Sequence, residues 1–89
     1  MKTKMLLPIG TVVLLKEGKK RLMITGYLVT PNDDKSITYD YSACMYPEGI
    51  ISSEQTLVFN HEEIESVFHK GFEDLEAQEF IKKLTEINK

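Results

Sequence analysis

At residues 39–49 the chain reads Tyr39-Asp40-Tyr41-Ser42-Ala43-Cys44-Met45-Tyr46-Pro47-Glu48-Gly49, an alternating run that ends in a proline–glycine turn. This stretch predicts a β-strand that connects the two halves of the domain. With the two-residue period of a β-strand, the odd-numbered residues from Tyr39 to Met45 share one face and the even-numbered residues share the other. We expect the first face to be covered and the second to be wet. Proline in the second and glycine in the fourth position of residues 46–49 predict a type I turn.

The segments around this strand predict the rest of an antiparallel sheet. Residues 11–16 are mostly apolar or β-branched and predict a first strand. Residues 17–19 predict a turn, in which Gly18 can take a positive φ, and residues 21–29 predict the second strand of the hairpin. Leu22, Ile24 and Leu28 share one face of that second strand with Gly26, where a bulge is expected. The polar run 30–35 links the second strand to the third, and short strands are predicted at residues 50–51 and 56–59. Such a curled sheet with basic hairpin ends resembles the start of a small SH3-like barrel.

Two helices are predicted after the sheet. Asn60 is a favoured N-cap with Glu63 three residues on, so a first helix is expected over residues 60–70, ending at Gly71. Phe72 should pack into the core, and Asp74 should cap a second helix over residues 74–87. The apolar positions of the second helix follow helical spacing and comprise Ala77, Phe80, Ile81, Leu84 and Ile87. The expected fold is therefore α+β in a single domain, 1–89, with about five strands over 1–59 followed by two C-terminal helices.

Composition restricts the class of protein. A chain of 89 residues that is 42% apolar can hold one modest core. Cys44 is the one cysteine, which excludes an internal disulfide and favours a reducing compartment, so we expect a cytoplasmic protein. Pro8 and Gly10 interrupt the early apolar run before it reaches the length of a signal-peptide core, and no stretch is long enough to span a bilayer.

The charges are divided unevenly along the chain. The net charge is −3, yet residues 1–30 carry six Lys or Arg and one acid, while residues 31–89 carry thirteen acids and five bases. Both sets can be ordinary solvated faces. Alternatively, the acidic half guides a basic partner through its long-range field.

Several residues could take part in catalysis or metal binding. His61, Glu65 and His69 would lie at i, i+4 and i+8 on the first predicted helix, where they could hold zinc. Cys44 could act as a nucleophile if His61 or Asp40 approached it. However, exposed histidines on a short helix and a lone cysteine in a strand are commonplace, and the chain has neither a spaced carboxylate pair nor a phosphate-binding glycine loop. We therefore predict no catalytic residue, no metal, no cofactor and no enzyme activity.

The aromatic residues fit two kinds of partner. Tyrosines on a curled sheet can stack bases while the basic hairpin holds phosphates, although the acidic C-terminal half would weaken nucleic-acid binding. Tyrosines beside a proline turn also suit a protein interface, because they bring large contact area at low entropy cost. We favour the protein interface. The predicted partner-binding residues are Tyr39, Tyr41, Tyr46, Pro47 and Glu48.

Five motifs in order cover nearly the whole chain and resemble a family of small uncharacterised-domain proteins from Gram-positive bacteria. They are Leu7-Pro8-Ile9-Gly10-Thr11-Val12-Val13, Tyr39-Asp40-Tyr41, Tyr46-Pro47-Glu48-Gly49, Phe59-Asn60-His61-Glu62-Glu63-Ile64 and Gly71-Phe72-Glu73-Asp74. Members are encoded beside type VII secretion toxins, the polymorphic toxins whose N-terminal domain is named for a Leu-any-Gly motif. The resemblance implies a cytosolic chaperone or targeting adaptor that binds the toxin before export, and it supplies no catalytic residues.

Two other functions stay open at this point. An immunity protein would neutralise the toxin in the producing cell, and a small barrel could bind single-stranded nucleic acid through its basic first hairpin. The sequence leaves the oligomeric state, the toxin and the binding face undetermined.

Overall fold

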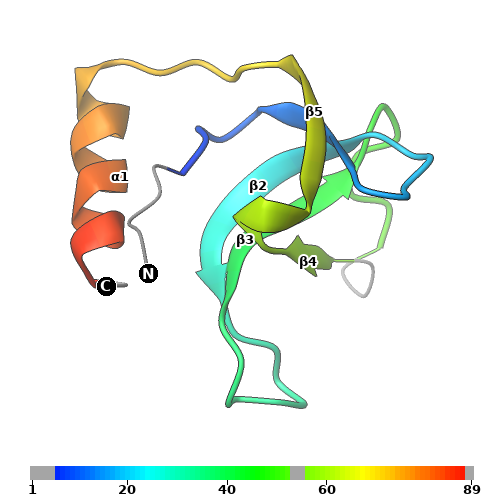
Figure 1. Ribbon diagram of the computed structural model, residues 1–89, viewed down its shortest axis with the longest axis horizontal. Coiled ribbons are helices and arrows are strands. Elements are labelled where there is room, and N and C mark those ends of the chain that lie inside the picture. The colour runs from blue at the N-terminus through cyan, green and yellow to red at the C-terminus, as the bar shows by residue number, and fades with distance from the viewer. Residues whose placement is uncertain (1–5, 53–55, 88–89) are drawn as a thin grey trace.

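The computed structural model describes residues 6–52 and 56–87, with the side chain of residue 87 left out, as a five-stranded antiparallel sheet followed by one C-terminal helix (Figure 1). The elements are β1 Val12–Leu15, β2 Leu22–Val29, β3 Tyr39–Met45, β4 Leu57–Phe59, a 3₁₀ turn η1 His61–Glu63, β5 Ile64–His69 and α1 Leu75–Ile87. The strands are arranged in the order β4-β3-β2-β1-β5, and no pairing between described residues joins β4 to β5. The predicted α+β class and the antiparallel sheet of five strands are confirmed, but only β1 to β4 lie within the predicted range 1–59.

Strand β3 lies between β2 and β4, as expected of the strand that joins the two halves. Tyr41 and Ala43 on its odd-numbered face are in the core, as predicted. The prediction of a wet opposite face is wrong, because Asp40, Ser42 and Cys44 are all buried. Their burial comes from tertiary contacts. The N–H of residue 61 in η1 donates to Asp40 Oδ2 at 2.8 Å, and Ser42 Oγ lies 3.1 Å from the Thr25 hydroxyl of β2.

The bulge predicted at Gly26 is confirmed, since the β2–β3 register shifts between Ile24 and Gly26. A Cβ atom at Gly26 would lie 2.6 Å from Ser42 Oγ, so a larger residue here would displace the Ser42 hydroxyl. Beyond the bulge, Tyr27 rather than Leu28 packs against the core, contrary to the predicted face. The extra residue of a bulge reverses the alternation of side chains.

The two turns of the sheet differ from their predictions. β1 and β2 pair as the expected hairpin, but the positive φ falls at Glu17 (64°) and not at Gly18. At the second turn the Tyr46–Pro47 peptide bond is cis, and the Gly49 N–H donates to the Met45 carbonyl at 2.7 Å. This bond spans one residue more than the predicted type I turn. Residues 50–51 form no strand, and Gly49 makes only an isolated bridge to Met45.

The predicted helix over residues 60–70 is wrong. The capping residues are in place, since the Asn60 N–H donates to Glu63 Oε2 at 3.0 Å, but only the single turn η1 follows. The chain then extends as β5, which pairs antiparallel with β1. The Lys16 N–H donates to the Glu63 carbonyl at 2.8 Å and starts this pairing. Pairing with β5 gives hydrogen-bond partners to the backbone groups on the otherwise unpaired edge of β1. These long-range hydrogen bonds outweigh the local preference for a helix after Asn60.

The second predicted helix is confirmed as α1. Asp74 caps it, because its Oδ1 accepts the Ala77 N–H at 2.9 Å. Ile81 is 1% exposed and joins the core, and Leu84 packs against that core. The placement of Phe72 in the core is wrong, since this side chain is 82% exposed.

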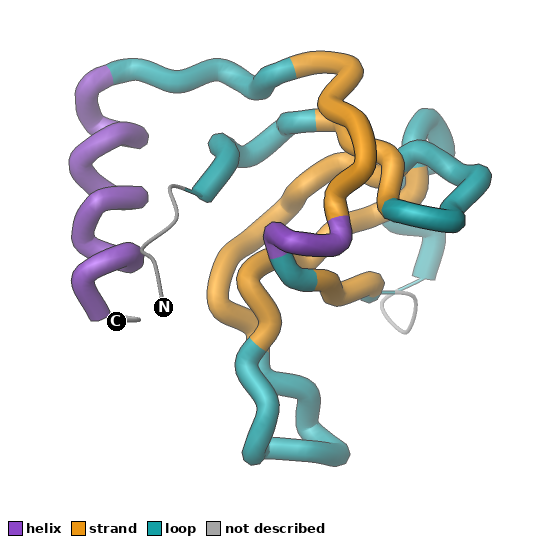
Figure 2. The backbone as a smooth tube through the Cα atoms, in the orientation of Figure 1, coloured by secondary structure: helices purple, strands orange, loops and turns teal. Residues whose placement is uncertain are grey.

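One compact junction connects the segment before α1 to the start of the sheet. The buried Thr11 hydroxyl donates to the Pro8 carbonyl at 2.7 Å and accepts the Gly71 N–H at 3.0 Å. Figure 2 shows the segment before β1 running between α1 and the strands, while the loop after β2 projects away from the sheet. Leu6 and Ile81 belong to the same hydrophobic cluster, so this N-terminal segment joins the helix to the sheet. The buried members of the cluster are Leu6, Val13, Leu22, Ile24, Tyr41, Ala43, Phe59 and Ile81.

Candidate partner-binding surface

Tyr41 is a core residue, and the structure does not present it to a partner. Its side chain is fully buried, and its ring lies 5.2 Å from the Phe59 ring between centroids. The Tyr41 hydroxyl accepts the Leu7 N–H at 3.0 Å and lies 2.7 Å from His61 Nδ1. Burial raises the pKa of Tyr41, and the hydrogen bond from Leu7 only partly offsets this effect. Tyr41 therefore fastens β3 to η1 and to the N-terminal segment.

The other predicted residues lie nearer the surface. Tyr39 is half-buried at the start of β3, whereas Tyr46, Pro47 and Glu48 are exposed. Lys20 donates a hydrogen bond of 2.7 Å to Glu48, which holds the pKa of this carboxyl below its usual value. The three turn residues stay a predicted binding site.

The structure adds two side chains to this turn. Arg21 Cζ lies 5.2 Å from the centroid of the Tyr46 ring and 6.0 Å from that of the Phe68 ring. An arginine at these distances is attracted to the faces of both rings. We call Arg21, Tyr46, Pro47, Glu48 and Phe68 the turn patch.

The candidate zinc site and the candidate Cys44 nucleophile are not assembled in the structure. Residues 64–69 are a strand, so His61, Glu65 and His69 do not share one face of a helix. Across the described ranges 6–52 and 56–87, no group of three His, Cys, Asp or Glu residues is placed to hold a metal ion. His61 instead uses Nδ1 toward the Tyr41 hydroxyl, and Cys44 is buried in β3. The residues that the zinc hypothesis required are thus separated by the strand geometry.

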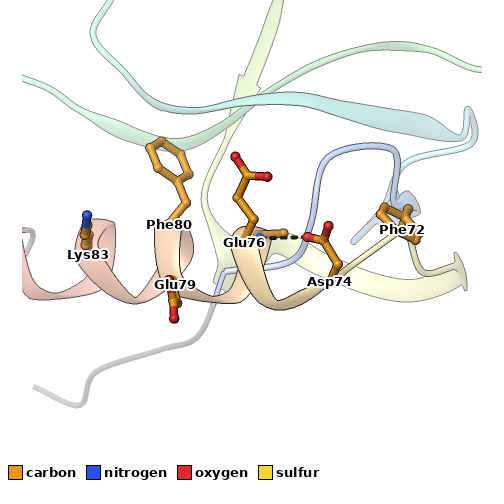
Figure 3. Close-up of a pocket in the computed structure, with 7 residues that line it drawn as sticks. Phe72, Asp74, Glu76, Glu79, Phe80 and Lys83 are labelled. Atoms are coloured by element: carbon orange, nitrogen blue, oxygen red, sulfur yellow. Dashed lines mark hydrogen bonds between the residues drawn. The ribbon is translucent and has the colours of Figure 1, made fainter.

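A second surface feature lies along α1 and was not predicted. We call it the helix groove, and Figure 3 shows its lining in close-up. Phe72 comes from the segment before the helix, and Phe80 projects from the second turn of α1 toward the strands. Phe80 is 51% exposed, although its ring centroid lies 6.2 Å from that of Tyr27 on β2. The groove is lined by Phe72, Asp74, Glu76, Ala77, Glu79, Phe80 and Lys83.

The charges of the helix groove are mainly negative. Three carboxylates and one amine line it. The Asp74 carboxylate is already used as the helix cap, while Glu76 and Phe80 point to the same side of α1 in Figure 3. Glu79 points to the opposite side of the helix. The groove thus places a carboxylate directly beside an exposed aromatic ring.

Part of this groove had a signal in the sequence. Phe80 has charged neighbours at the helical spacings i−4 and i+3, Glu76 and Lys83, which is typical of a position at the border of an apolar stripe. Phe72 had no comparable signal. It lies in the segment that leaves the sheet after β5 and crosses to α1, directly after the buried junction at Gly71.

The fold and these surfaces define a small α+β domain in which a curled antiparallel sheet carries one C-terminal helix bordered by exposed aromatic and acidic residues. No described helix combines the length and the apolar character needed to cross a membrane. Residues 6–80 match the domain of unknown function DUF4176, and the chain therefore belongs to the DUF4176 family. No curated protein and no solved structure matches the chain.

Proposed function

We propose that this DUF4176 domain is a non-enzymatic module that binds another protein. The observation that carries the proposal is the exposure of large apolar side chains around the start of α1. Phe72 is 82% exposed, Leu75 69% and Phe80 51%. Exposed apolar patches rimmed by polar residues are typical of protein interaction sites. Aromatic anchors of this kind contribute a large share of the binding energy in many interfaces.

We further propose that the partner is a type VII secretion toxin and that the domain acts in the cytoplasm as a chaperone or targeting adaptor. This part rests on the resemblance of the five sequence motifs, beginning with residues 7–13. Capture can occur on apolar surface or by addition of a strand at an edge of the sheet. β5 ends the strand order and carries two exposed apolar residues, Val67 and Phe68.

Co-expression with a candidate type VII secretion toxin, followed by size-exclusion chromatography, tests this function. The two chains are expected to elute together at moderate salt. Separate elution refutes the adaptor role.

Deletion of the gene for this domain in a toxin-producing cell distinguishes an adaptor from an immunity protein. Deletion of an adaptor stops export of the toxin and leaves the producing cell healthy. Deletion of an immunity protein allows the toxin to kill the producing cell, while export continues.

Single-stranded nucleic acid is a second candidate partner, which the turn patch favours. Arg21 lies beside two exposed aromatic rings, next to the basic first hairpin, and aromatic rings with cations are the usual components of such sites. The burial of Tyr41 removes it from the tyrosines that could stack bases. A nucleic-acid binder would shift a labelled oligonucleotide at low salt, and Lys19→Glu with Arg21→Glu would abolish that shift.

A further inference from the structure

We propose that the helix groove receives a lysine- or arginine-bearing amphipathic segment of the partner protein. This inference rests on the proposed function and assigns the chemistry of the ligand to one surface. An apolar side chain of the segment enters between Phe72 and Phe80, and a neighbouring cationic group pairs with Glu76.

The apolar part of the groove has room for a side chain from outside. Phe72 lies before the helix and Phe80 on its second turn, with Ala77 between them in the lining. The small Ala77 side chain adds little bulk to this lining. Because both rings are at least half exposed, an entering aliphatic group removes apolar surface of both partners from water.

The negative charge of the groove favours a positively charged partner segment. The lining holds Asp74, Glu76 and Glu79 against Lys83 alone. The basic turn between β1 and β2 lies at the far end of the molecule from α1 (Figure 1), so it does not neutralise the groove locally. Lys70 is already paired with Glu73 at 2.9 Å, just before the groove begins. A cationic segment is therefore attracted to this surface and an acidic one is repelled.

The same charges argue against a second copy of the chain as the occupant. Two helix grooves placed face to face would set the three carboxylates and one lysine of each copy against the same set, so that like charges outnumber the possible ion pairs. A partner segment with apolar residues at helical spacing and Lys or Arg beside them satisfies both the rings and the carboxylate.

Binding measurements with four variants test the assignment. Phe72→Ala and Glu76→Lys alter the groove, while Ile51→Ala and Glu86→Lys make comparable changes at exposed residues outside both the groove and the turn patch. With the purified toxin as ligand, each groove variant is expected to raise Kd by about tenfold or more, and each control to stay within about twofold. Wild-type affinity should also fall as NaCl rises from 50 to 300 mM, more steeply than that of Glu76→Lys.

A second probe makes the groove testable without the toxin. A labelled 14-residue peptide of Leu and Lys at helical spacing is compared by fluorescence anisotropy with its Leu and Glu counterpart. The Lys peptide should bind more tightly, and Phe72→Ala and Glu76→Lys should both weaken its binding.

The outcomes separate the two proposals. Toxin binding that neither groove variant alters overturns the groove assignment and leaves the adaptor function standing. Separate elution of the toxin, with groove-dependent binding of the Lys peptide, refutes the adaptor function and supports the groove. A concentration-dependent dimer that Phe72→Ala dissociates overturns the assignment in favour of self-association.

Discussion

Replacement of Gly71 by alanine is expected to be the most damaging single-methyl substitution in the chain. A Cβ atom at this position would overlap the Ile9 carbonyl oxygen and would lie 2.9 Å from the Thr11 amide nitrogen. Both are backbone atoms of the bend before β1, so no flexible side chain can move aside. The backbone of one segment must shift, and the hydrogen bond of 3.0 Å from the Gly71 N–H to Thr11 Oγ1 is strained or lost.

The expected loss can be estimated from these two effects. Overpacking of a closely packed site costs about 1–3 kcal/mol, and loss of a buried hydrogen bond costs about 1 kcal/mol more. A loss of about 3 kcal/mol is large for a domain whose whole stability is on the order of 5 kcal/mol. It corresponds to a Tm lower by about 12–24 °C in a domain of this size.

Thermal unfolding followed by circular dichroism measures the effect, with Gly49→Ala as the matched control. Gly49 has a φ of +79°, and a Cβ there would have no neighbour within 4 Å. The control therefore isolates the backbone cost of a left-handed residue, about 1 kcal/mol. If Gly71→Ala lowers the Tm no more than Gly49→Ala does, Gly71 is not closely packed against the bend before β1 and the reasoning is refuted.

Three further predictions concern stability. Tyr41→Phe leaves the Leu7 N–H and the His61 ring without the hydroxyl, so urea unfolding should show a loss of about 1–3 kcal/mol, whereas Tyr46→Phe should change little. Burial raises the pKa of Tyr41 above its unfolded value of 10.0, so the contribution of Tyr41 to stability should be constant below that pH and fall above it. Stability above that pH should therefore fall less steeply in Tyr41→Phe than in the wild type, and identical slopes would contradict this. Asp74→Ala removes the cap on the Ala77 N–H and should cost about 1 kcal/mol, while Asp74→Asn should keep most of it; equal losses would exclude capping.

Local sequence signals determined the elements whose partners lie close along the chain. The hairpin of β1 and β2, the position of β3, the bulge at Gly26 and the cap of α1 at Asp74 all followed from turn chemistry, periodicity or capping. These features depend on residues within a few positions of one another, so the sequence is enough to predict them.

The tertiary structure decided the features that depend on distant partners. The capping pattern at Asn60 is real, yet residues 64–69 became β5 because the backbone groups of β1 needed a partner strand. Burial of Asp40, Ser42 and Cys44 depends on contacts from other elements, which no periodicity encodes. Phe72 lies directly after Gly71, which is fastened to the bend before β1, sixty residues earlier. The candidate groove thus depends on a contact between residues far apart in the sequence. By contrast, the helical spacing of Glu76 and Lys83 around Phe80 can be read from the sequence alone.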